Sequence, residues 1–273
     1  MYVISKSSAD ALERPFRKMG ARVKFGEPET PRWVREVQPL ALDVHRDREG
    51  EYFHIRKRAD VSVEVLEVLP KDRHLVLLAR VPGIRGSETK SRFLLGHDER
   101  HWFVAAIPEQ SPVTTVAAAK QALKPEAVIL REIDVRARIR DRRINKARIR
   151  QGEWFFVPAR SVRIRTGRIL KNEPLRRGGG KPHVCQELYR EGGETVYVNG
   201  QYPNGLTQAE FGRLSEKART QPGWSRMVRN PRAFVRGTVR HSDHKTIFLE
   251  GWHEVFMNTE TQAAAMRNVA FLD

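Results

Sequence analysis

The segment 240–245, with the sequence RHSDHK, contains several side chains that could bind a metal ion. It holds His241, Asp243 and His244, and His253 follows one expected strand later. Imidazole and carboxylate groups are common ligands of zinc, manganese and iron, and a hairpin that returned near its start would bring His253 close to His244. Such a site would hold a divalent metal ion that activates water for phosphodiester hydrolysis. The plain alternative is a solvated turn, because turns also favour Ser, Asp and His.

Two other pairs of residues could carry chemistry. His97 and His101 flank two acidic residues in an expected hairpin, where a pair of histidines facing each other either binds a metal or simply borders the turn. His183 and Cys185 point to the same side of an expected strand, as a base and a nucleophile would, although no third member is identifiable. Convergence of three histidines from these segments at ligand distance would favour an enzyme, whereas their dispersal would favour a binding protein.

The positive charge of the chain is concentrated in its middle. The formal net charge is +17, and residues 131–181 carry 17 Lys and Arg against 5 Asp and Glu. A basic excess confined to about a fifth of a chain forms a patch, and basic patches bind polyanions. We therefore expect nucleic acid, either DNA or RNA, as the main partner, with an acidic protein as the alternative.

Arginines in this basic segment alternate with apolar residues. Over 133–140 the alternation predicts a strand whose guanidinium groups lie roughly 6.6–7 Å apart on one face. The range 134–150 could instead form an arginine-rich helix. A second stretch, 217–242, has seven cations and no acid, with two aromatic residues among them. The residues expected to contact the phosphate backbone are Arg136, Arg138, Arg140, Arg148, Arg150, Arg163, Arg165, Arg176, Arg177, Lys181, Arg229 and Arg232.

The composition excludes several classes of protein. Cys185 is the only cysteine, so an intramolecular disulfide and a multi-cysteine zinc site are impossible, and a reducing cytoplasm fits best. No apolar run approaches the roughly 20 residues that cross a bilayer, and the first residues lack the apolar core of a secretory signal. We expect a cytoplasmic protein that has no contact with a membrane. The oligomeric state stays open.

The elements that position these residues are mostly strands. Hairpins are expected over 61–81 and 92–107, a strand over 154–157, and a three-strand meander over 234–258. Short helices are expected at 8–19, 117–123 and 261–272, and a longer one should begin at Thr207 with a capping-box glutamate at 210 and run towards Pro222.

These elements predict an α+β protein, mainly of antiparallel strands and hairpins with a few short helices, in two packed lobes. Three consecutive glycines and two prolines mark 172–182 as a flexible linker. The N-terminal lobe, 1–171, is then β-rich and includes the basic segment 131–171, and the C-terminal lobe, 183–273, is α+β.

Three functions fit this sequence. The first is a nucleic-acid-binding protein that contacts the phosphate backbone through its arginines. The second is a metal-dependent nuclease or phosphodiesterase that uses the His/Asp cluster near 241–253. The third is a structural or assembly protein whose basic arm contacts an acidic partner or packs nucleic acid.

Overall fold

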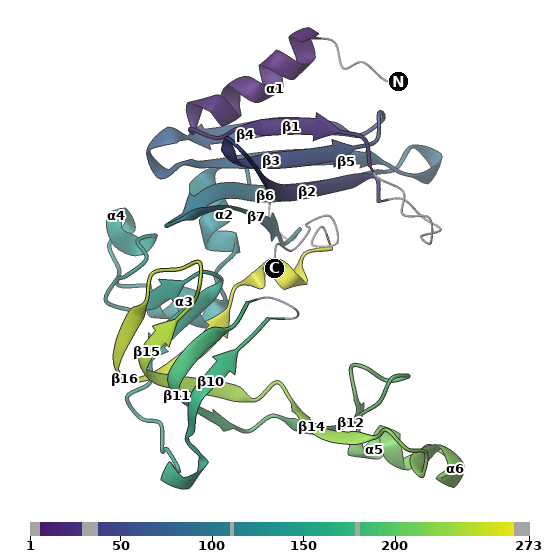
Figure 1. The fold of residues 1–273 in the computed structure, drawn as a ribbon, viewed down its shortest axis with the longest axis vertical. Coiled ribbons are helices and arrows are strands. Elements are labelled where there is room, and N and C mark those ends of the chain that lie inside the picture. Colours follow the sequence, from purple (N-terminus) through teal and green to yellow (C-terminus); the bar gives the residue numbers. More distant parts are fainter. Residues whose placement is uncertain (1–5, 29–37, 110–111, 178–180, 265–273) are drawn as a thin grey trace.

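The computed structural model describes residues 6–28, 38–109, 112–177 and 181–264. They form two packed lobes, built mainly of antiparallel sheets with a few short helices, so the predicted fold class is confirmed (Figure 1). In these ranges no helix combines the length and the apolar content needed to span a bilayer.

The N-terminal lobe is a sandwich of two sheets. One sheet has the strand order β1 (Val23–Gly26), β3 (Gly50–Lys57), β2 (Leu40–Asp47), with β1 and β3 parallel. The other is antiparallel and has the order β4 (Ser62–Leu69), β5 (His74–Pro82), β6 (Glu88–Asp98), β7 (His101–Ile107). Phe53 from the first sheet and Leu75 and Phe93 from the second are inaccessible to solvent and share one core, which Phe16 of α1 (Lys6–Lys18) completes.

A helix covers the outer face of the four-stranded sheet. Side chains alternate across a strand, so Val76 and Leu94 point away from the sandwich core. They pack against Val116 and Ala119 of α2 (Val116–Ala122), whose N-terminus is capped by the hydroxyl of Thr115. The chain then continues through α3 (Glu126–Arg131) and α4 (Ala137–Arg140) into the second lobe.

The C-terminal lobe is a single antiparallel sheet of six strands. Their order is β10 (Leu170–Leu175), β11 (His183–Glu191), β15 (Arg232–Arg240), β16 (Ile247–Met257), β9 (Trp154–Pro158), β8 (Ile149–Gln151). Leu188, Val235 and Leu249 are fully buried on one face of this sheet. The remaining turns are the 3-10 segments η1 (Pro70–Asp72), η2 (Ile84–Gly86), η3 (Thr166–Arg168) and η4 (Thr259–Gln262).

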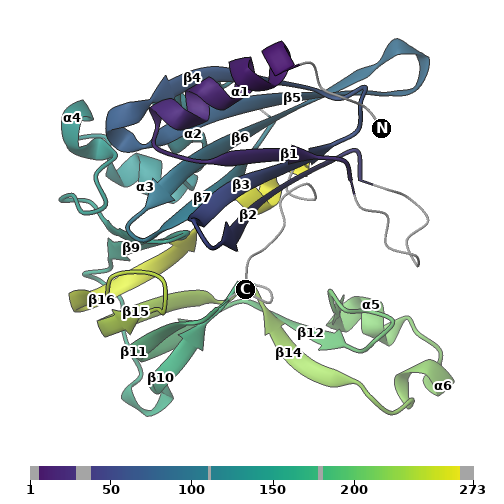
Figure 2. The same cartoon turned by 45° about the horizontal axis from the view of Figure 1, so that its top comes forward.

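An arm leaves this sheet between β11 and β15. It holds the small sheet β13 (Leu206–Thr207), β12 (Glu194–Val198), β14 (Ser225–Arg229) and the helices α5 (Gln208–Gly212) and α6 (Glu216–Arg219). Figures 1 and 2 both show the arm projecting away from the two lobes. Its core is aromatic, because Phe211 stacks on Tyr197 with ring centroids 4.1 Å apart and contacts Trp224 edge-on at 4.9 Å.

The range 172–182, predicted as a linker between lobes, does not separate them. Residues 172–175 belong to β10, which pairs with β11 in the same sheet, with Leu175 opposite His183. β8 and β9, which precede this range, belong to the same sheet. The lobes therefore divide in the helical stretch between β7 and β8, where the sequence offers no run of glycines. Residues 178–180 lie outside the described residues.

Three element boundaries differ from the sequence predictions. The range 133–140 is not a strand, since α4 occupies its end and 141–148 is irregular. The predicted helix from Thr207 keeps its capping box with Glu210 but ends at Gly212, and Ser215 caps a separate helix, α6. The last two strands of the predicted meander are one continuous strand, β16. The helix predicted at 261–272 lies largely outside the described residues.

A buried ionic cluster joins the helical stretch to the second lobe. Glu132, 1% exposed, accepts from Lys124 at 2.6 Å and from Arg148 at 2.8 Å. Asn145 also donates to Glu132 at 2.9 Å, and Arg148 donates to the carbonyls of two residues in the 140–143 turn. The irregular basic segment is thus held in shape by one carboxylate rather than by a strand ladder.

Replacing Glu132 by alanine should destabilise the protein strongly. The substitution leaves the charge of Arg148 buried without its counter-ion and leaves Lys124 paired with Asp141 alone, at 2.8 Å. Removing one partner of a buried ion pair costs about 3–5 kcal/mol in comparable sites. Urea unfolding should show a clear fall in the midpoint for Glu132→Ala. The control Glu126→Ala, an exposed acid at the start of α3, should leave the midpoint nearly unchanged; equal shifts in the two variants would contradict the role of the cluster.

Candidate active site

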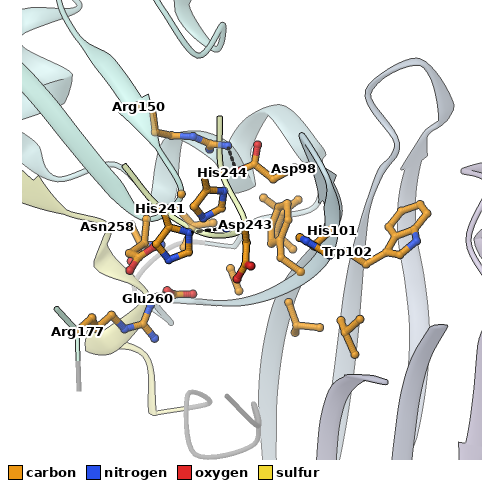
Figure 3. Close-up of a pocket in the computed structure, with 18 of the residues that line it drawn as sticks. Asp98, His101, Trp102, Arg150, Arg177, His241, Asp243, His244, Asn258 and Glu260 are labelled. Atoms are coloured by element: carbon orange, nitrogen blue, oxygen red, sulfur yellow. Dashed lines mark hydrogen bonds and ion pairs between the residues drawn. The ribbon is translucent and has the colours of Figure 1, made fainter. Parts of the chain in front are cut away.

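The two lobes enclose a cavity of about 510 Å³. The N-terminal lobe lines it with residues of β2, β3, β6 and β7, and the C-terminal lobe with residues of β8, β9, the turn 241–244 and the stretch 258–260 (Figure 3). Four histidines line it together with several Lys and Arg and a similar number of Asp and Glu. A mixed set of titratable groups in a concave site is typical of an active site rather than of a plain polyanion-binding surface.

The turn between β6 and β7 fixes the width of this cavity. Glu99 at the turn pairs with Arg143 and accepts a hydrogen bond from the backbone N–H of Lys245. Next to it, Arg100 donates to the carbonyl of Ser242 at 3.2 Å, and Asp98 pairs with Arg150 at 3.4 Å. The N-terminal lobe therefore holds the turn 241–245 directly.

Three histidines of the C-terminal lobe converge, and two of them, His241 and His244, line the cavity. His183 begins β11, and His241 and His244 lie in the turn between β15 and β16. One ligand nitrogen from each lies within 4.8 Å of the other two. Three atoms so placed share a point about 2.8 Å or less from each of them, against roughly 2.0–2.1 Å for a zinc–imidazole bond. The three rings are stacked, with centroids 4.2–5.6 Å apart and planes 23–25° from parallel, so they would have to rotate as well as approach before their lone pairs met at one ion.

His183 is oriented by groups behind the cavity. It is 1% exposed, and its Nδ1 lies 3.0 Å from Oε1 of Gln151. Gln151 donates through its amide nitrogen to two backbone carbonyls, so its oxygen must accept from His183 and the proton sits on Nδ1. Nε2 of His183 lies 3.7 Å from a carboxylate oxygen of Glu153; burial opposes ionisation of Glu153, but the interaction with His183 outweighs it and lowers the pKa of the carboxyl group. A cation between these two groups would satisfy both of them.

His241 and His244 are held in their uncharged form. Burial lowers the pKa of His241, and burial lowers the pKa of His244 to about 4. Nδ1 of His244 is buried and has no hydrogen-bond partner within the described part of the chain. Neutral imidazoles are the form that binds metal ions, and an unpartnered buried nitrogen is costly unless something occupies it.

Glycine is required next to His244. Gly152 has a φ of +56°, in the left-handed region, and a Cβ there would lie 2.6 Å from Nε2 of His244. His241 is less free, because its Nδ1 accepts from the backbone N–H of Asp243 at 3.1 Å. That hydrogen bond has to open if this nitrogen is to bind an ion.

A histidine–glutamate pair stands on the opposite wall. Nδ1 of His101 lies 2.5 Å from a carboxylate oxygen of Glu51, whose other oxygen accepts from the backbone N–H of Trp102 at 3.0 Å. Burial opposes ionisation of Glu51, but these two hydrogen bonds outweigh it and lower the pKa of its carboxyl group. An ionised glutamate on Nδ1 leaves Nε2 of His101 free to take a proton from a reacting group.

The structure places the other predicted chemical groups as follows. Asp243 lines the cavity and pairs with Lys181 at 3.0 Å. His253 lies along β16, outside the histidine cluster, with its Nδ1 2.8 Å from the carbonyl of Gly251. His97 is opposite Trp102 in the strand register and does not face the other histidine of its hairpin. Cys185 is fully buried, and burial raises the pKa of its thiol to about 12, which makes it inert as a nucleophile.

The predicted phosphate-binding arginines fall into three groups. Arg148 is buried against Glu132, and Arg140 donates to the carbonyl of Val135, so both stabilise the helical stretch. The cavity is lined by Arg150, Arg177 and Lys181. The third group lies at the surface, on three separate segments and on the arm or its base: Arg136, Arg138, Arg163, Arg165, Arg176, Arg229 and Arg232. Arg229 is partly exposed and the other six are exposed. Arg229 and Arg232 pair with glutamates.

Several residues of the site escaped the sequence analysis. Glu153 and Gln151 flank Gly152 just before β9, and Glu51 lies in β3. A usable signal was present for Glu153, which stands directly before the tryptophan that opens β9, as His101, named in the sequence analysis, stands before Trp102 in β7. An ionisable residue at such a position lies at the rim of a sheet, where a cavity can form.

No protein-family model, curated protein or solved structure matches this chain.

The histidine cluster should make the metal-free protein sensitive to acid. The folded-state pKa of His244, about 4, lies below its ordinary value of 6.5. The unfolded chain therefore takes up this proton first, and stability falls as the pH is lowered from 6.5 to 4, by up to about 3 kcal/mol. Urea midpoints between pH 7 and 4 should drop less steeply in His244→Asn. Part of the slope should remain, because burial also lowers the pKa of His74 to about 4; an unchanged slope would contradict the assignment.

Proposed function

We propose that this protein is a metal-dependent phosphodiesterase that acts on nucleic acid in the cavity between its lobes. The observation that carries the proposal is the convergence of His183, His241 and His244, of which His241 and His244 line the cavity. Three imidazoles with an open side towards a cavity are the ligand set of catalytic zinc sites. The carboxylate of Glu153, beside His183, would either be the fourth ligand of the ion or would orient the His183 imidazole.

The positive charge of the chain and the proposed hydrolysis both favour nucleic acid as the substrate. The overall charge of +17 favours a polyanion, and a phosphodiester needs nearby cations to offset its developing negative charge. Lys181 and Arg46 line the cavity and are exposed. No ion pair or hydrogen bond of the Arg46 side chain occurs among the described residues, so it is free to meet a phosphate.

The reaction would be a hydrolysis. When an ion is held by His183, His241 and His244, it would lower the pKa of a water molecule bound to it. The oxygen of this water forms a bond to phosphorus while the bond from phosphorus to the ester oxygen breaks. His101, held by Glu51, accepts the proton that the water loses. The leaving oxygen takes a proton from solvent, so one water is consumed for each ester bond broken.

Removing a ligand should remove the ion and the activity together. The protein purified with zinc or manganese should hold about one ion per chain, and His241→Ala and His244→Ala should hold much less. Cleavage of a labelled oligonucleotide should fall by at least about tenfold in both variants and in the presence of a chelator. His253→Gln, which alters a histidine outside the cluster, should keep the ion. A wild-type protein that binds no divalent ion and cleaves no nucleic acid would end the proposal.

The histidine on the opposite wall should affect rate and not metal binding. His101→Gln removes the base, so kcat should fall by about 10²–10⁴-fold while the metal content stays at the wild-type value. The acidic limb of the pH–rate profile should also disappear, since that limb reports protonation of the base. If His101→Gln lost the ion, or kept the acidic limb, this role would be wrong.

A further inference from the structure

A second hollow lies at the other end of the six-stranded sheet. It has a volume of about 610 Å³ and is lined by Arg163, Arg165 and Arg168, which belong to the segment between β9 and β10, and by Arg232 at the start of β15. Glu191 is the acidic residue among its lining residues. Four guanidinium groups around one hollow form a site for phosphate groups. We call it the arginine groove.

Three of these arginines are available to a ligand. Arg232 forms ion pairs with Glu254 at 2.7 Å and with Glu191 at 3.3 Å, so the charge of Glu191 is offset within the groove. Arg163, Arg165 and Arg168 are exposed. Within the described ranges, none of these three side chains has an ion pair or a hydrogen bond to a side chain. Repulsion among three exposed, unpaired positive charges destabilises the folded protein, and a bound polyanion would offset this repulsion.

The edge strand of the sheet connects the arginine groove to the cavity. β10 begins just after Arg168 and ends opposite His183, which belongs to the histidine cluster. Lys171 on this strand and Arg176 just beyond it are exposed, and Lys181 lines the cavity itself. The acid on the strand, Glu173, is answered by Arg190 at 2.8 Å. Lys171 and Arg176 thus add two exposed cations between the groove and the cavity, where Lys181 is paired with Asp243 at 3.0 Å.

We infer that the substrate is a single-stranded polynucleotide, one end of which lies in the cavity while its backbone follows β10 to the arginine groove. The inference rests on the proposed function for the part that concerns cleavage. A cavity of about 510 Å³ holds a mononucleotide-sized group, so the reacting nucleotide must be unpaired. The edge cations bind phosphates and carry no base contacts, so binding is independent of sequence.

The length of β11 gives the reach of the site. From His183 to Glu191 the strand spans eight steps, or about 26 Å at roughly 3.3 Å per residue. A stacked single strand carries one phosphate per about 3.4 Å, so on the order of eight nucleotides join the cavity to the groove, and fewer when the strand is extended. An oligonucleotide of about three nucleotides would occupy the cavity alone.

Binding can be tested without catalysis. The groove variant is Arg163→Ala/Arg165→Ala/Arg168→Ala. Its matched control removes the same charge from α1, at the opposite end of the molecule, through Arg14→Ala/Arg17→Ala/Lys18→Ala (Figure 1). Fluorescence anisotropy with labelled single strands of about 20 nucleotides, as RNA and as DNA, should show at least tenfold weaker binding for the groove variant and a salt slope smaller by about 2. The control should change binding by less than about twofold.

Cleavage then separates the two proposals. The groove variant should raise KM for the strand of about 20 nucleotides and leave cleavage of the trinucleotide unchanged, because only the longer strand reaches the groove. Absence of cleavage by the wild-type protein would overturn the proposed function. The anisotropy measurement would still show whether the groove binds a single strand. Three results would overturn the inference. The groove variant and the control could lose the same affinity for the single strand, or the wild-type protein could bind a duplex more tightly than a single strand. The groove variant could also lose more affinity for polyglutamate, a model acidic protein, than for the oligonucleotide.

Discussion

The docking of one turn against the second lobe determines the geometry of the rest of the site. Glu99 reaches across from the β6–β7 turn to Arg143 and to the backbone of Lys245. Through these contacts the N-terminal lobe sets the position of the 241–245 turn and hence of two of the clustered histidines. The cavity lies between these lobes, with the His101–Glu51 pair contributed by the N-terminal lobe and His241 and His244 by the other. Neither lobe alone contains the site.

The positive charge of the chain serves two different purposes. Part of it is consumed inside the protein, where Arg148 stabilises an irregular segment through Glu132. Another part is exposed, as in Arg163 and Arg165 of the groove, which form no ion pair within the part of the chain that the structure describes. Counts of basic residues along a sequence do not separate these purposes, because an arginine beside a buried carboxylate and one facing solvent look alike in sequence. Only the position of the acidic partners distinguishes a structural cation from one that can bind a ligand.

Much of the fold could be predicted from the sequence, and little of the site. Strand alternation and turn residues located the hairpins, and the capping box of Thr207 located a helix start, because these signals are local. The lobe boundary could not be found this way, since it depends on which strands pair. Two of the three clustered histidines, His241 and His244, could be proposed together as metal ligands because they are close in the sequence. The third member of the cluster, His183, lies far away in the chain and reaches them only because β11 and β15 are neighbours.

The arm has a topological property that bears on how such a chain can vary. It leaves and re-enters the large sheet at Glu191 and Arg232, which are register partners on adjacent strands. The main sheet is therefore complete without the residues 192–231, and a tight reverse turn could close the same two strands. An insertion at such a position can be lost, lengthened or exchanged between related proteins while the lobes and the cavity keep their geometry.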